Sequence, residues 1–378
     1  MSFEFATATR IIFGSGALSQ IGTIARDLGR RALIVTGSDT ARASPLIQLL
    51  EKAGIASIPF PVTGEPVPDT VTRGVALARS EQCDLVIGFG GGSAIDAGKA
   101  VAAMMTNDGE LLDYLEVIGR GRPLSKPSAP FIAIPTTAGT GAEVTRNAVL
   151  GSPGHRVKVS LRSPLMLPRV ALVDPALTLD LPPAITASTG LDALTQLLEA
   201  YVSIRANPMT DALCEQGIRI AARSLEKTFT TPRDLAARED MSLAAMYSGI
   251  ALANAGLGAV HGFAAPIGGM FPAPHGAVCA ALLPQVWKAN LAAVTARGTD
   301  AQRLRFGQAA NLLAGNEDAV TWLHSIRTRL LIPPLRSYGI EKAHFDEIIA
   351  RASQASSMKA NPVVLTDVQL NDILRAAL

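Results

Sequence analysis

The sequence lacks the features that would assign it to several common classes of protein. Its 34 Lys and Arg residues are nearly balanced by 32 Asp and Glu residues, which gives a formal net charge of +2. A protein that binds nucleic acid electrostatically needs a strong basic stripe, so the composition indicates no nucleic-acid partner. The sequence also contains no internal repeat, no low-complexity segment and no long run of like charge.

Long apolar runs are missing as well, although 48% of the residues are hydrophobic. Stretches such as RALIVTG and CDLVIGFGGG are short, and none reaches the roughly 18 to 20 residues that a membrane span needs. The first residues, MSFEFATATRIIFG, lack the basic region and apolar core of a secretory signal. We therefore expect a cytoplasmic enzyme with no membrane partner.

Cysteine is scarce. Cys83, Cys214 and Cys279 lie far apart in the sequence, and they form no C-x-x-C pair. This spacing indicates neither a disulfide framework nor a cysteine-rich metal site. We expect each of the three to be a small, buried, apolar residue.

The chain changes character near residue 180, and its length of 378 residues favours two domains. Residues 1–180 alternate β-rich runs with helical stretches, which predicts an α/β domain with a parallel, doubly wound, Rossmann-like sheet. Residues 181–378 are rich in Ala and Leu at helical spacing, which predicts an all-helical domain. The expected strands lie within 30–37, 56–64, 83–92 and 129–139, and the expected helices within 43–54, 68–82 (with Asp69 as N-cap) and 93–107.

A glycine-rich segment, GFGGGSAIDAGKA, follows the third expected strand. Glycines let a backbone approach a ligand closely, and the N–H groups that begin the next helix attract phosphate. Gly91 and Gly92 therefore predict a dinucleotide or phosphate site, with Ser93 or Asp96 capping or orienting the helix. The alternative is a tight turn, since the segment is not a G-x-G-x-x-G fingerprint.

A second loop, IPTTAGTGAEVT, follows the fourth expected strand. Thr136, Thr137 and Thr140 place hydroxyl groups near the same edge of the sheet. A turn with local threonine-to-backbone bonds would explain the pattern too. Beside a pyrophosphate loop, a second cofactor-binding loop is the better interpretation.

Two of the five histidines, His261 and His275, lie in the apolar segment GLGAVHGFAAPIGGMFPAPHGAV. Asp192 lies on an expected helix, with Gln196 one turn later on the same face. Two imidazoles and a carboxylate are suitable ligands for Zn²⁺ or Fe²⁺ with a position left for substrate. The alternative is an Asp near a helix start and a His in a turn, because the sequence does not show that these residues meet.

Seven motifs, in order along the chain, resemble the iron-containing (group III) alcohol dehydrogenases. The resemblance implies an N-terminal dinucleotide-binding domain and a C-terminal helical domain, as in dehydroquinate synthase-like proteins, with a metal in the cleft between them. It also implies NAD or NADP as cofactor, a small alcohol or aldehyde as substrate, and a homodimer or higher oligomer. The motifs are FGSGAL, GFGGGSAIDAGKA, IPTTAGTGAEVT, LVDPALT, GLDALTQLLEAYVS, GLGAVHGFAAPIGG and PHGAVCAALLP.

The resemblance also assigns roles to individual residues. Asp192, His261 and His275 match metal ligands and are the expected catalytic residues. A fourth ligand in the family is usually His; here that position is Gln196, whose oxygen is expected to bind the metal more weakly than imidazole, and the alternative is a site of three ligands. A further family His, near the reacting carbon, is replaced by Ala265. The expected cofactor-binding residues are Gly37, Gly91, Gly92, Ser93, Asp96, Thr136, Thr137, Thr140 and Lys158.

Gly37 bears on the choice of cofactor. NAD-preferring members of the family carry an Asp at this position, and its carboxylate repels the 2′-phosphate of NADP. Its replacement by glycine favours tolerance of NADP, although Asp39 lies only two residues away. Lys158 matches a family lysine near the ribose, and a surface ion pair is the alternative role for it.

The resemblance therefore implies hydride transfer between a nicotinamide and a metal-held alcohol, aldehyde or ketone. Replacement of two family histidines by Gln196 and Ala265 predicts a roomier, more apolar pocket that favours bulky or hydrophobic substrates. The main alternative is a metal-independent keto-acid reductase of the maleylacetate reductase type. A dehydroquinate synthase-like lyase is the weaker alternative, because the helical half shows no dense basic cluster.

Overall fold

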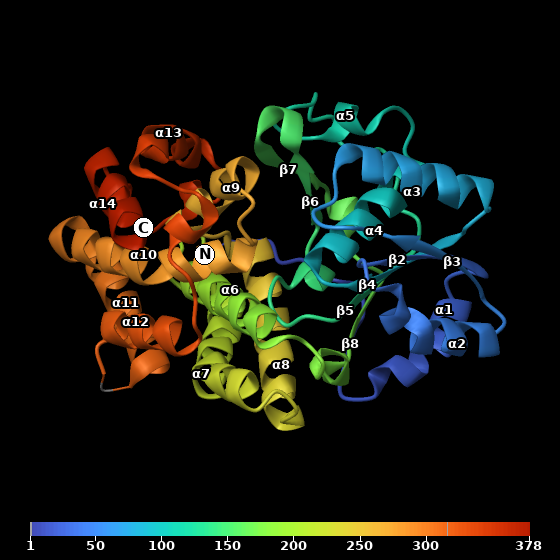
Figure 1. Cartoon of the computed structure of the whole chain (residues 1–378), viewed down its shortest axis with the longest axis horizontal. Helices are drawn as coiled ribbons and strands as arrows, with labels where there is room; N and C mark the ends of the chain where they lie inside the picture. The colour runs from blue at the N-terminus through green and yellow to red at the C-terminus, as the bar shows by residue number, and fades with distance from the viewer. Residues whose placement is uncertain (1, 316) are drawn as a thin grey trace. The chain divides into compact units, whose positions relative to one another are not determined.

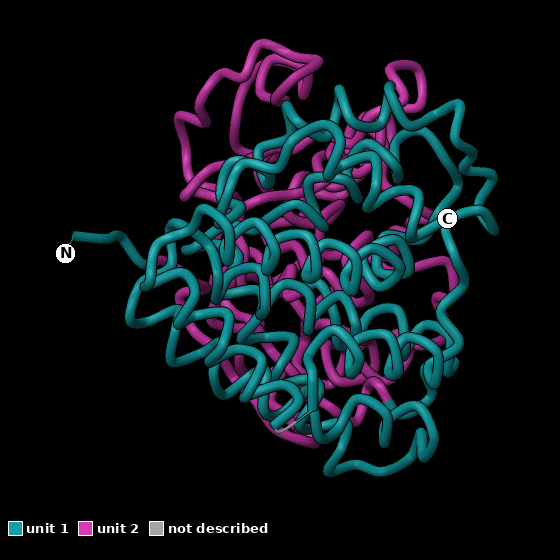
Figure 2. The backbone as a smooth tube through the Cα atoms, turned by 90° about the vertical axis from the view of Figure 1, so that its left-hand side faces the viewer, with its two compact units in different colours: residues 1–5, 138–140, 179–378 teal, residues 6–137, 141–178 magenta. Residues whose placement is uncertain are grey.

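The computed structural model describes residues 2–315 and 317–378, which divide into two compact units (Figure 2). One unit comprises residues 6–137 and 141–178. The other comprises residues 179–378, the short segment 138–140 and the N-terminal residues up to Phe5. The units are therefore not contiguous in sequence, because the segment 138–140 belongs with the helices.

The first unit contains a six-stranded sheet, counted over the described residues, in the order β1-β8-β5-β4-β2-β3. All of its neighbouring strands are parallel, which confirms the predicted sheet. The four expected strands are β2, β3, β4 and β5; β1 and β8 were too short to stand out as separate runs. The bounds are β1 Ile11–Phe13, β2 Arg31–Thr36, β3 Ala56–Pro61, β4 Leu85–Gly90, β5 Phe131–Pro135 and β8 Val170–Val173.

Helices cover both faces of this sheet, as Figure 1 shows. Alternate residues of β2 point to opposite faces: Leu33 and Val35 pack in the core with α3 and α4, whereas Ala32 and Ile34 pack in the core with α1 and α2. Strands buried on both faces require nearly continuous apolar runs, and that is the pattern in the sequence. The bounds are α1 Ile21–Arg26, α2 Ser44–Lys52, α3 Pro68–Ser80, α4 Gly92–Thr106 and α5 Leu111–Tyr114.

Two expectations about helix starts are wrong. Helix α3 begins at Pro68 with Val67 as its N-cap, and Asp69 lies in the first turn, where it pairs with Arg73 at 3.0 Å. Helix α4 has Gly91 as its N-cap without a side-chain cap in the described chain. Proline at the first helical position and glycine at the N-cap both begin a helix without a capping side chain.

An antiparallel hairpin, β6 Asn147–Ser152 and β7 Val157–Arg162, was not predicted. It is attached to α4 by polar contacts as well as by apolar packing in a shared core. The backbone N–H of Val149 donates to Asp96 at 3.1 Å, and the buried Lys99 donates to the carbonyl oxygen of Asn147. In the structure, buried and partly exposed side chains alternate along β6, which is the period of a strand.

The second unit is helical, as predicted, and its long helices surround α6 (Figure 1). Helix α6 is buried over most of its circumference, which is typical of a central helix. The bounds are α6 Pro183–Val202, α7 Pro208–Thr230, α8 Leu235–Ala255, α9 Ala259–Met270, α10 His275–Arg297, α11 Asp300–Ala314, α12 Ala319–Arg329, α13 Phe345–Gln354 and α14 Asp367–Ala377.

Helix α10 is long and apolar enough on average to cross a membrane, although charged and polar residues interrupt it. In the structure, 72% of its most apolar window is buried inside the protein. Its apolar character is therefore accounted for by packing in the core of the helical unit.

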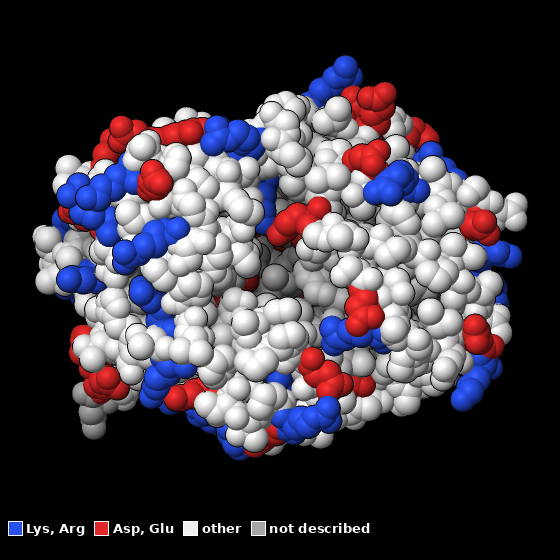
Figure 3. Space-filling view, in the orientation of Figure 1, with Lys and Arg blue, Asp and Glu red and all other residues white. Residues whose placement is uncertain are grey.

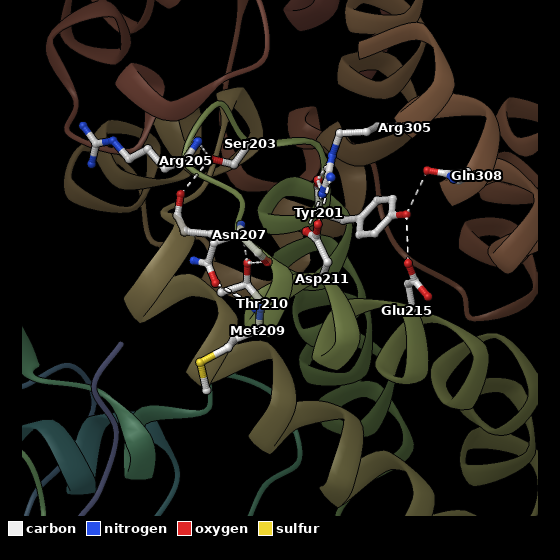
Figure 4. Close-up of polar contacts among 11 residues, drawn as sticks. Tyr201, Ser203, Arg205, Asn207, Met209, Thr210, Asp211, Glu215, Arg305 and Gln308 are labelled. Atoms are coloured by element: carbon white, nitrogen blue, oxygen red, sulfur yellow. Dashed lines mark hydrogen bonds and ion pairs between the residues drawn. The ribbon is translucent and has the colours of Figure 1, made fainter. Parts of the chain in front are cut away.

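Polar contacts join α6, α7 and α11 (Figure 4). Asn207 caps α7 by accepting from the N–H groups of Met209 and Thr210. On α11, the Arg305 guanidinium lies 4.4 Å from the centre of the Tyr201 ring and forms two hydrogen bonds with Asp211. The planar guanidinium thus ties three helices together.

The charged surface is mixed in sign. On the face that Figure 3 shows, Lys and Arg alternate with Asp and Glu, often as neighbours. Among the described residues, Arg223 lies 2.8 Å from Asp240 and Lys126 lies 2.9 Å from Asp108. This pattern agrees with the small net charge in the sequence.

Candidate active site

Helix α6 supplies the acidic side of the candidate metal site. Asp192, Gln196 and Glu199 lie about one and two turns apart, so they share one face of the helix. All three side chains are buried, and Asp192 is only 1% exposed. Buried carboxylates require charged or hydrogen-bonding partners, and the neighbouring helices provide them.

Glu199 anchors the start of helix α9. Its Oε1 accepts from the backbone N–H of Val260 at 2.7 Å, and its Oε2 lies 2.6 Å from Nδ1 of His261. A carboxylate accepts, so we assign the hydrogen of the second contact to Nδ1 of His261. A side chain at Gly258 would place Cβ 2.8 Å from Oε1 of Glu199, so glycine permits this close approach.

The start of helix α10 completes the cluster. His275 is its first residue, and Gly276 brings the helix against α6, because a Cβ there would lie 2.4 Å from the carbonyl oxygen of Ser188. Nε2 of His275 lies 3.8 Å from Oδ1 of Asp192, and Nε2 of His261 lies 3.3 Å from the same oxygen. The two imidazole rings are 5.4 Å apart.

This arrangement suits a cation. Oδ1 of Asp192 is buried and has no hydrogen-bond partner among the residues that the structure describes. With the Nδ1 hydrogen donated to Glu199, the lone pair on Nε2 of His261 faces that oxygen. Two acceptors directed at one another are unfavourable unless a positive charge lies between them. A carboxylate behind a histidine is also the usual support of a metal-bound imidazole.

The pKa shifts of Asp192 and His261 also indicate that the cluster suits a cation. Burial alone would raise the pKa of Asp192, but His275 and His261 lower it below its ordinary value. Burial would lower the pKa of His261, yet Cys279, Asp192 and Glu199 together raise it well above its ordinary value. The surroundings therefore favour a positive charge at Nε2 of His261, carried either by a proton or by a metal ion.

Two residues of this cluster were missed in the sequence. Glu199 is seven positions after Asp192, which places it on the same helix face. Cys279 is one turn after His275, and its Sγ lies 3.7 Å from Nε2 of both histidines. Asp192, His261, His275 and Cys279 each offer a ligand atom, and these four atoms lie within 4.8 Å of one another.

The two departures from the family pattern lie on α6 and α9. Oε1 of Gln196 accepts from Oγ of Ser248 at 2.6 Å, and its Nε2 donates to the carbonyl oxygen of Thr140 at 3.4 Å. The Gln196 side chain is thus held by the protein through both of its polar atoms. Ala265 lies one turn after His261 on α9 and is partly exposed.

The expected cofactor residues of the first unit gather at the carboxyl ends of neighbouring strands. Gly37 follows β2, Gly91 and Gly92 follow β4, and Thr136 and Thr137 follow β5. The chain leaves β2 for β3 on one side and returns to β4 on the other, so the topology switches between β2 and β4. Open α/β sheets bind ligands at such a switch point.

Contacts at this edge are tight. The N–H of Thr136 donates to the carbonyl oxygen of Gly90 at 2.9 Å. A Cβ at Gly90 would lie 2.7 Å from Cβ of Ala94 and 3.4 Å from the backbone nitrogen of Gly37, so a side chain would close the gap between β2 and β4. Gly91, Gly92 and Ser93 are partly exposed, so the backbone at the start of α4 is accessible to a ligand.

The remaining expected cofactor residues have partners in the protein. Ser93 lies in the first turn of α4. Asp96 accepts from Val149 and lies 3.3 Å from Nζ of Lys99, while burial raises its pKa. Lys158, on β7, donates to Oε1 of Glu65 at 2.7 Å. Thr140 belongs to the helical unit, next to Gln196.

Comparison with known proteins identifies relatives over the whole chain. Residues 8–175 match the model of iron-containing alcohol dehydrogenases, and residues 186–378 match the C-terminal model of Fe-containing alcohol dehydrogenases. The chain is 35% identical to the 1,3-propanediol dehydrogenase of Klebsiella pneumoniae, covering 99% of this chain and 98% of that protein. It is 36% identical to the long-chain-alcohol dehydrogenase 1 of Geobacillus thermodenitrificans, with 98% and 97% covered.

A solved structure of 1,3-propanediol oxidoreductase superposes over 100% of both chains with a TM-score of 0.93 and 34% identity. Proteins of this group are alcohol oxidoreductases that use NAD and a metal. Both halves of the chain match, and their folds agree with the motifs and the metal-ligand cluster. The chain belongs to the iron-containing alcohol dehydrogenase family, and its activity is that of an NAD(P)-dependent, metal-assisted alcohol dehydrogenase.

Proposed function

We propose that Asp192, His261 and His275 hold a divalent metal ion, Fe²⁺ or Zn²⁺, and are the catalytic residues of this dehydrogenase. The observation that carries the proposal is the buried Oδ1 of Asp192, which lies 3.3 Å and 3.8 Å from Nε2 of the two histidines. Both metals accept imidazole nitrogen and carboxylate oxygen as ligands. When bound, the ion would polarise the oxygen of the alcohol or carbonyl substrate.

Three further residues around the metal site have distinct roles in this proposal. Glu199 is a positioning residue, because it holds the Nδ1 hydrogen of His261 and so directs Nε2 toward the site. Gln196 is the position of the usual fourth ligand, and its oxygen would have to leave Ser248 to serve in that role. Ala265 supplies no imidazole, so the proton would pass through water or the ribose hydroxyl groups.

For the cofactor, we propose that NAD or NADP binds at the carboxyl edge of the sheet. Gly91, Gly92 and Ser93 would receive the pyrophosphate at the start of α4, whose 15 residues give a full helix dipole. Gly37 would lie by the adenosine ribose, with Thr136 and Thr137 on the next strand. Asp96 and Lys158 would support this region through Val149 and Glu65, and Thr140 through Gln196.

The substrate in this proposal is a bulky or hydrophobic alcohol or aldehyde. Its support is the absence of two imidazoles, at Gln196 and Ala265, from positions where the family usually carries them. A panel of alcohols from ethanol to long-chain and aromatic members tests it through kcat/KM. The highest value with ethanol or a short diol would contradict the proposal.

We also propose a cytoplasmic homodimer or higher oligomer. Three free, buried thiols suit a reducing compartment. The edge strand β1, whose Phe13 is 37% exposed, offers a surface where a second copy could be placed. Sedimentation of the purified protein tests the oligomer.

Metal analysis with chelation tests the proposed function as a whole. We expect one equivalent of Fe or Zn per chain, activity that falls after treatment with a chelator, and recovery when the metal is restored. Asp192→Asn should abolish both metal retention and activity. Full activity of the metal-free protein would instead favour the keto-acid reductase, and activity toward maleylacetate-like keto acids would then be measured.

A further inference from the structure

We propose that Cys279 is a protein ligand of the metal and completes a four-donor set with Asp192, His261 and His275. The inference rests on the metal site of the proposed function and adds a residue that replaces the family's missing fourth donor. Its Sγ lies 3.7 Å from Nε2 of His261 and 3.7 Å from Nε2 of His275. The Cys279 side chain is fully buried, so it faces the cluster rather than solvent.

Four of the six distances between the donor atoms are close to those of a tetrahedron. With metal bonds of about 2.0–2.1 Å to nitrogen or oxygen and about 2.3 Å to sulfur, tetrahedral donors lie about 3.3–3.6 Å from one another. Four of the six separations in the cluster are 3.3, 3.7, 3.7 and 3.8 Å. These differ from the tetrahedral values by about half an ångström or less, and all four donor atoms lie within 4.8 Å of one another.

The position of Cys279 on α10 explains why its sulfur lies close to the other donor atoms. Cys279 follows His275 by one turn of α10, so both side chains lie on the same face of the helix. The buried Oδ1 of Asp192, which has no hydrogen-bond partner within the described residues, lies within 4.8 Å of Sγ of Cys279. The oxygen of Gln196 is occupied by the hydroxyl of Ser248 at 2.6 Å. Cys279 is thus better placed than Gln196 to act as the fourth donor.

The chemistry of sulfur has a consequence for the metal. On binding, the Cys279 thiol releases its proton to solvent, and the sulfur keeps the electron pair that it donates to the ion, so no oxidation or reduction occurs. A thiolate is a softer ligand than a carboxamide oxygen, and Asp–His–His–Cys is a donor set that suits Zn²⁺. Zinc should therefore be retained more tightly than in a site built from Gln196.

The first test uses the unaltered protein, reconstituted with one equivalent of Zn²⁺ and studied by X-ray absorption at the zinc edge. We expect one sulfur scatterer at about 2.3 Å together with nitrogen and oxygen scatterers at about 2.0 Å. A shell of nitrogen and oxygen alone would overturn the role of Cys279 and leave the proposed function in place. Failure to retain either zinc or, in a parallel reconstitution, Fe²⁺ would overturn both, so the two failures are distinguishable.

The second test replaces zinc with Co²⁺, since thiolate coordination to cobalt produces a charge-transfer band in the near ultraviolet. We expect the band in the unaltered protein and its loss in Cys279→Ser and Cys279→Ala. Cys214→Ser is the matched control, because Cys214 is equally buried in the same unit but lies outside the cluster.

Gln196→Ala should keep the cobalt band, and circular dichroism would verify that each variant is folded. Persistence of the band in Cys279→Ser, or its loss in Gln196→Ala alone, would overturn the proposal.

Discussion

Nδ1 of His261 lies 2.6 Å from Oε2 of Glu199, and this contact orients the imidazole so that its other nitrogen faces Asp192. Glu199 also accepts from the N–H of Val260, so one carboxylate fixes both the start of α9 and the direction of its histidine. Glu199 would thereby hold the proposed ligand His261 in position without itself touching the metal.

We expect Glu199→Gln to weaken metal binding by about 10- to 100-fold, the usual effect of losing such a partner. The glutamine keeps the volume of the side chain but has only one acceptor atom for two donors. Competition against a chromophoric chelator measures the affinity. Glu226→Gln, in a surface ion pair with Arg329, is the control and should bind metal normally. Equal affinities in the two variants would contradict the orienting role.

Glu199 and Cys279 are two residues of the candidate site that could not be identified from the sequence. Their spacings, seven residues after Asp192 and four after His275, are visible in the sequence. Helices α6 and α10 are buried over most of their surface, however, so periodicity does not reveal which side meets which neighbour. The close approach of α10 to α6 depends on Gly276, whose contact with Ser188 is formed only in three dimensions.

The same reasoning applies to the fold. The parallel sheet and the helical half were predictable, because buried strands and Ala/Leu-rich helices have distinct periods. The hairpin β6–β7 was not, because its strands are short and bury only alternate residues, such as Ala148 and Leu150, in the core shared with α4. The N-caps were equally difficult to predict, because Val67 and Gly91 precede α3 and α4 without a side-chain cap.

Gly37 gives a prediction about cofactor choice. A Cβ at this position would meet nothing within 4 Å, so an aspartate fits without a clash. Its charge would repel the 2′-phosphate of NADP, and we expect Gly37→Asp to raise the KM for NADP about tenfold or more while the KM for NAD changes little. Asp39 lies two residues further on, and one of its carboxylate oxygens accepts from the N–H of Ala41. Gly37→Asn, which adds volume without charge, separates repulsion from steric effects; an equal rise in both variants would contradict the argument.

Arg305 gives a prediction about stability. Its side chain is about three-quarters buried. The guanidinium stacks on Tyr201 and forms hydrogen bonds with Asp211 of the neighbouring helix (Figure 4). We expect Arg305→Ala to lower the free energy of unfolding by about 1.5–3 kcal/mol, the range for hydrogen bonds to charged groups. Arg73→Ala breaks a more exposed ion pair with Asp69 and should cost less than about 1 kcal/mol. Denaturant titration compares the free energies of unfolding of the two variants. Equal losses would show that the contacts of Arg305 stabilise the protein no more than a surface ion pair does.

Glu143 gives a prediction about pH. It is buried in the loop after β5, and burial raises its pKa from 4.5 to about 7, against the opposing effects of a backbone hydrogen bond and Lys99. The folded protein therefore holds a proton between about pH 4.5 and pH 7 that the unfolded chain has already released. Glu143 accordingly favours the folded state less and less as the pH rises through this window, by at most about 1.4 kcal/mol per pH unit.

Glu143→Gln removes this titration and keeps the shape of the side chain. We expect the variant to gain stability relative to the unaltered protein as the pH increases from 5 to 7, with the difference constant above about pH 8. The gain over the whole window should be at most about 3 kcal/mol, measured by denaturant titration at each pH. Glu81→Gln, at a half-exposed side chain paired with Arg31, should show no comparable trend. A pH-independent difference between Glu143→Gln and the unaltered protein would mean that Glu143 stays ionised in the folded state and is compensated by Lys99, which lies buried in the same region.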